Sequence, residues 1–207
     1  MTTTFSDAVT ISGAAKFTST ISGIDRTKLD TITGSAFPIK LTDFRVHDAF
    51  ATVLPGTSAT DDLGLYGGSF GTNSPLIQTY DVKTVGATTL YGRALVQLPY
   101  NYVDGSSVSI KCHAGMEGAV ADTSCTLDCE VYESDAEGGI GSDLVTTAAT
   151  TINSLTYADV SYTVTAAGLV AGDWLDLRLA VAVNDGAGGA SVQAAIGSVE
   201  LVCDTKG

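Results

Sequence analysis

The sequence contains few charged residues, and most of these are acidic. Charged residues make up 16% of the 207 residues, with 10 Lys and Arg against 23 Asp and Glu, so the net charge is -13. With 44% hydrophobic residues, the composition differs from that of a disordered chain or a coiled coil. The acidic excess argues against nucleic-acid binding through phosphates and against docking on an anionic membrane.

Long apolar runs and targeting signals are also missing. The most apolar stretch, 175–183, is interrupted by Asp176 and Arg178 and is too short to span a bilayer. The first ten residues, MTTTFSDAVT, contain neither a basic n-region nor an apolar h-region. We therefore expect neither a membrane span nor a secretory signal.

Signatures of catalysis are scarce. Only His47 and His113 offer an imidazole base, and there is no G-x-S-x-G motif and no phosphate-binding loop. His47 lies in a segment typical of a half-exposed strand, where we expect a surface or interface histidine. A pair of cleft carboxylates, as in glycosidases, is the alternative that the sequence leaves open. We expect no enzymatic activity and no cofactor.

Alternation of apolar and polar residues predicts strands along most of the chain. Its clearest example places Leu177 and Leu179 on one side of a strand and Arg178 on the other. The alternation changes parity at Gly197–Ser198, which predicts a β-bulge. Strands are expected at 39–54, 76–85, 88–98, 107–113, 123–131, 156–165, 175–183 and 192–203. Short strands with polar connections predict an all-β, jelly-roll-like antiparallel β-sandwich over 39–207, with its core strands at about 88–203.

Residues 1–38 differ from this pattern and predict an extended N-terminal arm. They are rich in Thr and Ser, and their apolar residues are irregularly spaced. Residues 1–60 hold five acidic and five basic groups, whereas the other 147 residues hold 18 acidic and 5 basic ones. This asymmetry indicates either a solvated acidic surface or a neutral arm that contacts a partner. For the second case, the expected contact residues are Phe5, Ile11, Phe17, Ile21, Ile24, Lys28, Ile32 and Phe37.

The four cysteines fall on the apolar sides of their expected strands. Cys125 and Cys129 are about 13 Å apart along one strand, too far to bridge each other. We predict that these two, together with Cys112 and Cys203, are buried free thiols. A disulfide from Cys112 to Cys125 or Cys129 is the alternative. Zinc is disfavoured because no two cysteines have the close spacing of a zinc site.

An acidic, glycine-rich loop at 133–143 is the candidate for a divalent ion. Its carboxylates include Asp135, Glu137 and Asp143, and calcium takes oxygen ligands from such loops. The spacing does not match an EF-hand. We therefore expect a solvated loop and assign no metal, with these three residues as the weak candidates.

Three stretches carry a resemblance to a known class of proteins. They are Leu95–Ile110 (LVQLPYNYVDGSSVSI), Asp128–Asp135 (DCEVYESD) with Gly141–Val145 (GSDLV), and Gly168–Leu179 (GLVAGDWLDLRL). Together they resemble β-sandwich virion structural proteins of tailed bacteriophages, of the capsid decoration or cement type. The resemblance covers about 88–203 and carries over no functional residues.

This resemblance implies a capsid decoration protein that binds the outer capsid surface and stabilises the shell. The expected partners are the major capsid protein and further copies of the chain, as a homotrimer. Its expected location is the capsid exterior, after synthesis in the host cytoplasm. The alternative is a carbohydrate- or receptor-binding β-sandwich module on a virion or cell surface. Trp174 is the single Trp, so an aromatic cluster for sugar would draw on Tyr66, Tyr91, Tyr100 or Tyr102.

Overall fold

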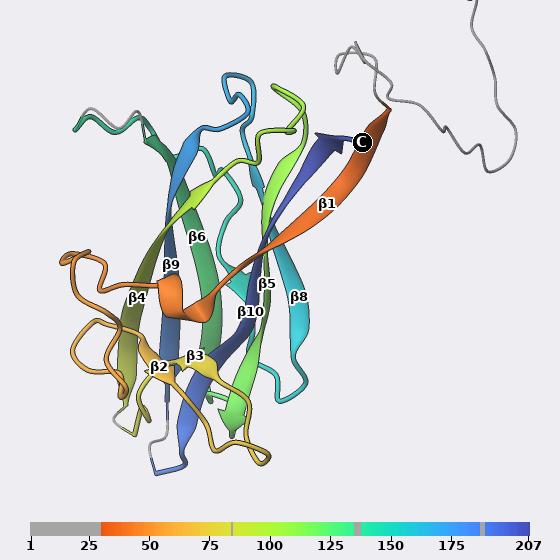
Figure 1. Cartoon of the computed structure of the whole chain (residues 1–207). Coiled ribbons are helices and arrows are strands. Elements are labelled where there is room, and N and C mark those ends of the chain that lie inside the picture. The colour runs from red at the N-terminus through yellow and green to blue at the C-terminus, as the bar shows by residue number, and fades with distance from the viewer. Residues whose placement is uncertain (1–29, 84, 135–137, 187–188) are drawn as a thin grey trace, which may run out of the picture.

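The computed structural model describes residues 30–83, 85–134, 138–186 and 189–207, which form two antiparallel sheets in a sandwich (Figure 1). The six-stranded sheet has the order β2 (Gly64–Tyr66), β3 (Leu76–Gln78), β10 (Val192–Lys206), β5 (Val108–Gly118) and β8 (Ala158–Val164), with β1 (Thr31–Ile39) also paired to β10. The four-stranded sheet has the order β4 (Gly86–Gln97), β9 (Trp174–Asp185), β6 (Ser124–Ser134) and β7 (Thr150–Thr151). Among the described residues, no helix has the length and apolarity needed to cross a membrane.

The alternating residues form the strands because each strand has one face in the common core. Leu177 and Leu179 of β9 are fully buried, whereas Arg178 lies on the outer face. β9 pairs with β4 on one side and β6 on the other over nearly its whole length. The predicted all-β sandwich and the interior position of the two leucines are therefore confirmed.

The core also decides the state of the cysteines. Cys112, Cys125, Cys129 and Cys203 are all buried and free, which confirms the prediction and shows that the disulfide alternative is wrong. Burial raises the pKa of Cys112 and Cys125 to about 12, so both stay protonated and unreactive at neutral pH.

One tyrosine joins the two layers through the core. The hydroxyl of the buried Tyr162, on β8, donates to the main-chain carbonyl of Leu127 on β6 at 2.5 Å. A buried phenol needs such an acceptor, since an unpaired hydroxyl would be costly. This bond links the six-stranded sheet directly to the four-stranded sheet.

The register of β10 shifts between Ile196 and Ser198, beside Gly197, and this confirms the predicted bulge. Before the bulge, β10 pairs with β3 at Ala195 and Ile196. After the bulge, β10 pairs with β1 from Val199 onward. One edge of β10 is thus shared by β3 and β1. After Gln78 the chain stays beside β10 through separate hydrogen bonds, from the Thr79 N–H to the carbonyl of Ala194 and from the Val82 N–H to that of Val192, so the predicted 76–85 strand is regular only over β3.

The sandwich begins earlier than the predicted boundary at residue 38. Strand β1 pairs with β10 from Thr31 to Ile39, so these residues belong to the sheet of their own chain. A bulge between Ile32 and Ser35 contains Gly34, whose φ of 68° favours glycine. The Gly34 N–H donates to the Asp204 carboxylate at 2.9 Å. These contacts place 31–38 in the sandwich, and the rest of the expected arm, 1–29, lies outside the described residues.

The expected partner-contact residues separate into three groups. Phe37 is partly buried and packs against the core of its own chain, and its contact with a partner stays a prediction. Ile32 is 53% exposed on β1, so its contact with a partner stays a prediction. The others lie outside the described residues; they are Phe5, Ile11, Phe17, Ile21, Ile24 and Lys28.

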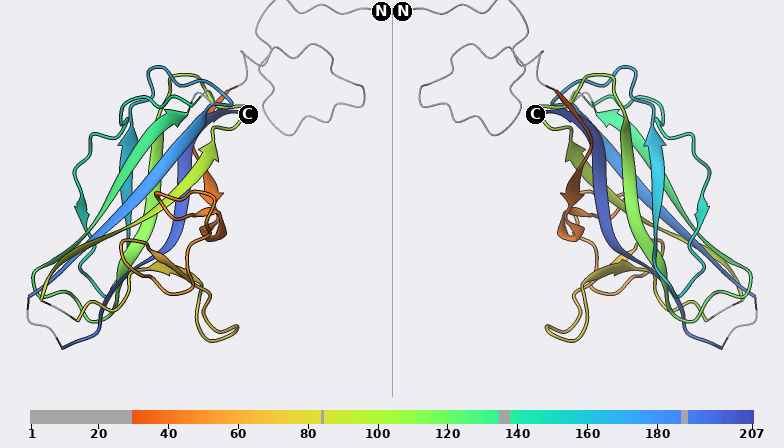
Figure 2. Two further views of the ribbon diagram at one scale, coloured as in Figure 1. Left: turned by 90° about the vertical axis from the view of Figure 1, so that its left-hand side faces the viewer. Right: turned by 90° about the vertical axis from the view of Figure 1, so that its right-hand side faces the viewer.

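The predicted strands over 39–54 are wrong beyond Ile39. A short 3-10 helix, η2 (Leu41–Asp43), is followed by a loop that contacts the outer edge of β4. Arg45 exchanges two main-chain hydrogen bonds with Arg93, at 2.7 and 3.0 Å, and then the chain turns away. Figure 2 shows this part of the chain, in orange and yellow, on one side of the sandwich. It becomes one wall of the candidate site.

Candidate functional site: a groove on the four-stranded sheet

The outer face of the four-stranded sheet contains a groove of about 250 Å³. Its floor comes from three neighbouring strands, β4, β9 and β6, and its walls come from two loops. The lining residues are His47, Arg93, Tyr132, Ile140, Asp176 and Arg178. The strand alternation that buries Leu177 places Asp176 and Arg178 on this face.

Strand register brings two arginines side by side on the floor. Arg93 of β4 lies directly opposite Arg178 of β9, and Glu130 of β6 lies opposite Arg178 on its other side. Like charges in such positions repel each other, so each arginine needs its own carboxylate. This requirement explains why two acidic residues lie on the same face.

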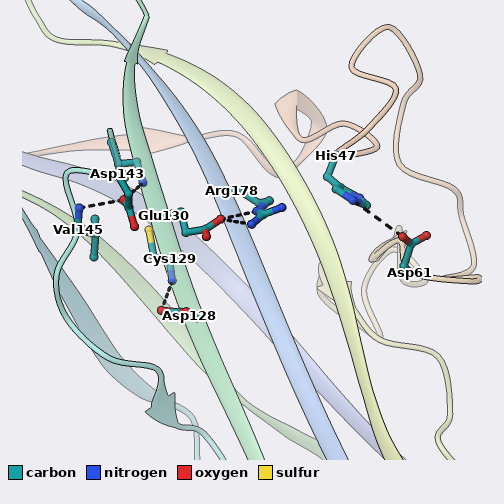
Figure 3. A network of polar contacts seen from close by, with 9 residues as sticks. His47, Asp61, Asp128, Cys129, Glu130, Asp143, Val145 and Arg178 are labelled. Atoms are coloured by element: carbon teal, nitrogen blue, oxygen red, sulfur yellow. Dashed lines mark hydrogen bonds and ion pairs between the residues drawn. The ribbon is translucent and has the colours of Figure 1, made fainter. Parts of the chain in front are cut away.

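Both arginines are held by two-point contacts to carboxylates. The Arg93 guanidinium donates to both oxygens of Asp176, with Nε to Oδ1 at 2.7 Å. The Arg178 guanidinium donates to Glu130 from Nε at 2.5 Å and also from Nη2 (Figure 3). Asp176 is buried, with 9% of its side chain exposed, and the hydrogen bond to it raises the pKa of Arg93. The floor is therefore charged locally but neutral overall.

Aromatic rings surround these ion pairs. The Arg178 guanidinium lies 4.9 Å from the Tyr91 ring centre, and the Arg93 guanidinium lies 5.0 Å from that of Phe50. The His47 and Tyr91 rings are 4.6 Å apart. Tyr132 lines the groove itself, and burial raises its pKa, so its hydroxyl remains a donor at neutral pH. Each arginine is thus fixed by a carboxylate and by a ring.

The two walls come from loops that the strand pattern alone does not describe. His47 follows η2, and its main-chain carbonyl accepts a 3.5 Å hydrogen bond from Arg93. Ile140 is 56% exposed and lies in the loop after β6, bridged to Ser134. Farther along the same outer face, Leu95 and Trp174 are 39% and 40% exposed. The groove therefore continues into an exposed apolar surface.

The sequence-based candidates are only partly brought together here. Of the four tyrosines considered for sugar binding, Tyr91 supports the groove, whereas Tyr66, Tyr100 and Tyr102 line other hollows. Tyr132 and Arg93 were not predicted as site residues. The alternation in the 123–131 strand places Glu130 on the polar side. Tyr132, two residues later, lies on the same side, so this alternation was the signal that could have identified it.

In the described part of the acidic loop, the Asp143 carboxylate is held by main-chain hydrogen bonds. Asp143 Oδ1 accepts hydrogen bonds from the N–H groups of Val131 and Val145, both at 3.0 Å, and so fastens the loop to β6 (Figure 3). These bonds give the Asp143 carboxylate a structural role, and its candidacy as a metal ligand stays a prediction. Asp135 and Glu137 lie outside the described residues.

A larger hollow of about 420 Å³ lies at one end of the sandwich, where Tyr100, Asp104 and Lys206 are among its lining residues. Gly207 also lines it and donates to the carbonyl of Asp30, the first described residue. This hollow lies where the described chain begins, whereas the groove lies on the outer face of the four-stranded sheet.

Comparison with known proteins finds no family and distant structural similarities. The sequence matches no family model and no curated protein. A Stig cyclase, Fisc, from Fischerella sp. TAU aligns with 84% of this chain and 100% of its own at 12% identity and a TM-score of 0.44. The CBM22-1 xylan-binding domain of Paenibacillus barcinonensis Xyn10C aligns at 15% identity and a TM-score of 0.39, covering 70% of this chain and 82% of its own.

A xylan-binding module of the CBM15 type aligns at 10% identity and a TM-score of 0.38, covering 82% of this chain and 97% of its own. Similarities this low do not determine what the chain binds. The class that the coordinates themselves define is an antiparallel β-sandwich with a groove on the outer face of one sheet.

Proposed function

We propose that this chain is a binding module that takes a neutral carbohydrate in the groove of the four-stranded sheet. The observation that carries the proposal is the combination of Tyr132 with two internally compensated arginine–carboxylate pairs in one groove. Binding sites of this kind combine apolar contact area with a few fixed polar groups. The function proposed is recognition, without a chemical step.

The chemistry of the groove suits sugar hydroxyl groups. A hydroxyl both donates and accepts, so it can bind a carboxylate oxygen and a guanidinium N–H of the same ion pair. Tyr132 and the exposed Trp174 offer flat surfaces for the apolar face of a sugar ring. Since the guanidinium groups of the two arginines are already fixed by Asp176 and Glu130, little side-chain ordering is needed on binding.

The charge of the groove favours a neutral ligand over an anionic one. Both arginine charges are compensated by carboxylates within the site. An anionic sugar would compete with Asp176 and Glu130 for the guanidinium groups, and it would approach a chain with a net charge of -13. A neutral oligosaccharide has neither disadvantage.

Calorimetric titration of the full chain with neutral and acidic oligosaccharides tests the proposal. We expect binding to a neutral member, and a loss of about tenfold or more in affinity for Tyr132→Ala. Tyr100→Ala is the matched control, because Tyr100 is 78% exposed and lies outside the groove. No binding to any neutral sugar, or equal losses in the two variants, would refute the assignment.

The second candidate function is capsid decoration. In this case the chain would bind the major capsid protein on the capsid exterior and would associate with further copies of itself as a trimer. It is supported by the sequence resemblance and by the charge distribution, since residues 1–60 are neutral and the whole excess of -13 lies beyond them. Contacts through a neutral segment would let copies with acidic bodies crowd on one shell. Co-sedimentation with undecorated capsids that is unchanged in Tyr132→Ala but lost on deletion of 1–36 would favour this function.

A further inference from the structure

His47, Asp48 and Asp62 converge beside the groove. One potential ligand atom from each residue lies within 4.8 Å of the others. In the part of the chain that the structure describes, no second group of three such ligands occurs. The three residues come from two separate loops, one after η2 and one before β2.

Two atoms in this group are buried and lack hydrogen-bond partners. His47 Nδ1 and Asp62 Oδ1 have almost no exposed surface, and they face each other at 3.6 Å. That distance is too long for a hydrogen bond. Buried polar atoms without partners are rare in folded proteins, and a missing ion is one established reason for them. The pair therefore points to a ligand between the two atoms.

The spacing agrees with a shared metal ion. Two ligand atoms bound at about 2.0–2.1 Å to a tetrahedral ion lie about 3.3 Å apart, close to the 3.6 Å between His47 Nδ1 and Asp62 Oδ1. Asp48 is exposed, so its side chain can change rotamer to complete the set.

A fourth residue lies where a supporting carboxylate is expected. The other ring nitrogen of His47, Nε2, faces Asp61 Oδ2 at 3.9 Å (Figure 3). Metal-binding histidines usually direct their second ring nitrogen to a carboxylate or carbonyl, which fixes the tautomer and the ring orientation. Asp61 is therefore a positioning residue in this arrangement, outside the ligand set.

We infer that His47, Asp48 and Asp62 form a binding site for a divalent transition-metal ion, with Zn²⁺ as the fitting species and Mn²⁺ as the comparison ion. Imidazole nitrogen is a preferred ligand of transition metals, whereas Ca²⁺ and Mg²⁺ prefer oxygen ligands throughout. The three carboxylates around His47 also supply the negative charge that a divalent cation neutralises. Three protein ligands leave a further coordination position to water.

The site would join two loops that otherwise contact β4 at few points. Asp61 and Leu63 exchange main-chain hydrogen bonds with Tyr91 at 2.7 and 2.9 Å, and the other loop pairs with β4 at Arg45. An ion held by His47 and Asp62 would fasten one loop to the other and stiffen the His47 wall of the groove. This inference does not depend on which ligand the groove takes.

Titration of the chelator-treated full chain with ZnCl₂ and with MnCl₂ tests the site. We expect one ion per chain and a raised thermal midpoint, because an ion that binds the folded state stabilises it. Binding should be lost in His47→Gln and in Asp48→Asn; Asp48 is exposed, so the second variant keeps the fold intact. Asp61→Asn should weaken binding by about 10–100-fold.

The matched control is His113→Gln, which changes the second histidine of the chain. His113 also lies beside an aspartate, but its Nδ1 is already hydrogen-bonded to Asp159 at 2.7 Å. Wild-type binding should persist in this variant. No binding of either ion at millimolar concentration, or binding that survives both His47→Gln and Asp48→Asn, would overturn the inference. A thiolate charge-transfer band with Co²⁺ would place the ion on the cysteines and would overturn it equally.

Discussion

The outer faces of the two sheets both pair basic side chains with carboxylates, but they do so in different surroundings. On the six-stranded sheet, Lys111 binds Glu200 at 2.6 Å and His113 binds Asp159 at 2.7 Å, in each case between side chains of paired strands. On the four-stranded sheet, Arg93 binds an almost fully buried carboxylate beneath the loop that carries His47. The difference teaches that strand register pairs the charges on both faces, whereas the groove also needs the walls that the loops of His47 and Ile140 supply.

The two histidines, one on each face, differ in the same way in their burial and their hydrogen bonds. His113 is 46% exposed and directly hydrogen-bonded, so its environment is complete. The His47 side chain is 15% exposed, and its Nδ1 has no hydrogen-bond partner. The two histidines thus both lie beside aspartates, but only His47 has a buried ring nitrogen without a hydrogen-bond partner. We place the candidate ion at His47 for this reason.

The largest expected effect comes from the core that lies beneath both faces. Leu177→Ala should lower the free energy of unfolding by about 2–5 kcal/mol, because it leaves a cavity in close-packed surroundings. Leu95→Ala, on the outer face of β4 with 39% of the residue exposed, should cost under about 1 kcal/mol. Urea unfolding of both variants measures the difference, and equal costs would contradict the assignment of inner and outer faces.

A smaller effect should separate the ion pairs of the two faces. Arg93→Met leaves the buried Asp176 carboxylate without its partner and should cost about 1–3 kcal/mol. Lys111→Met makes the same kind of change on the six-stranded sheet, where the Glu200 side chain is 28% exposed, and should cost under about 1 kcal/mol. Chemical denaturation in low and high salt provides the measurement. A larger cost for Lys111→Met would show that burial of the carboxylate does not set the cost of losing its partner.

The smallest effect concerns the pH response of the exposed face. The hydrogen bond from His113 lowers the pKa of Asp159 below its ordinary value of 3.8. A lowered carboxyl pKa contributes stability above the ordinary value, and that contribution is lost as the pH falls through the lowered pKa. In His113→Gln the pKa of Asp159 should move up toward 3.8 in an NMR titration. An unchanged pKa would mean that the contact does not form in solution.

Strand placement was largely predictable because each strand of the sandwich contributes one face to the core. Leu177, Cys129 and Val183 fall where alternation places them. The segment 39–54 was not predictable in the same way. Its apolar residues Phe44 and Leu54 are buried, but they enter the core from a loop rather than a strand. Hydrophobic pattern identifies burial and leaves the backbone conformation to long-range pairing.

The groove residues were partly predictable and partly not. The polar parity of β9 identifies Asp176 and Arg178 as outward-facing, but it does not identify their partners. Arg93 and Asp176 are 83 positions apart, and only the register of β4 against β9 brings them together. The His47 cluster depends in the same way on two loops meeting at β4.

The sequence by itself determined the all-β class, the buried free cysteines, the bulge at Gly197 and the inward face of β9. These follow from local alternation, which each strand carries in its own residues. Tertiary structure alone decided that β1 joins the sheet of its own chain, that Asp143 fastens a loop, and that His47 meets Asp62. Those outcomes depend on which distant segments pair and in what register, and a short stretch of sequence does not contain that information.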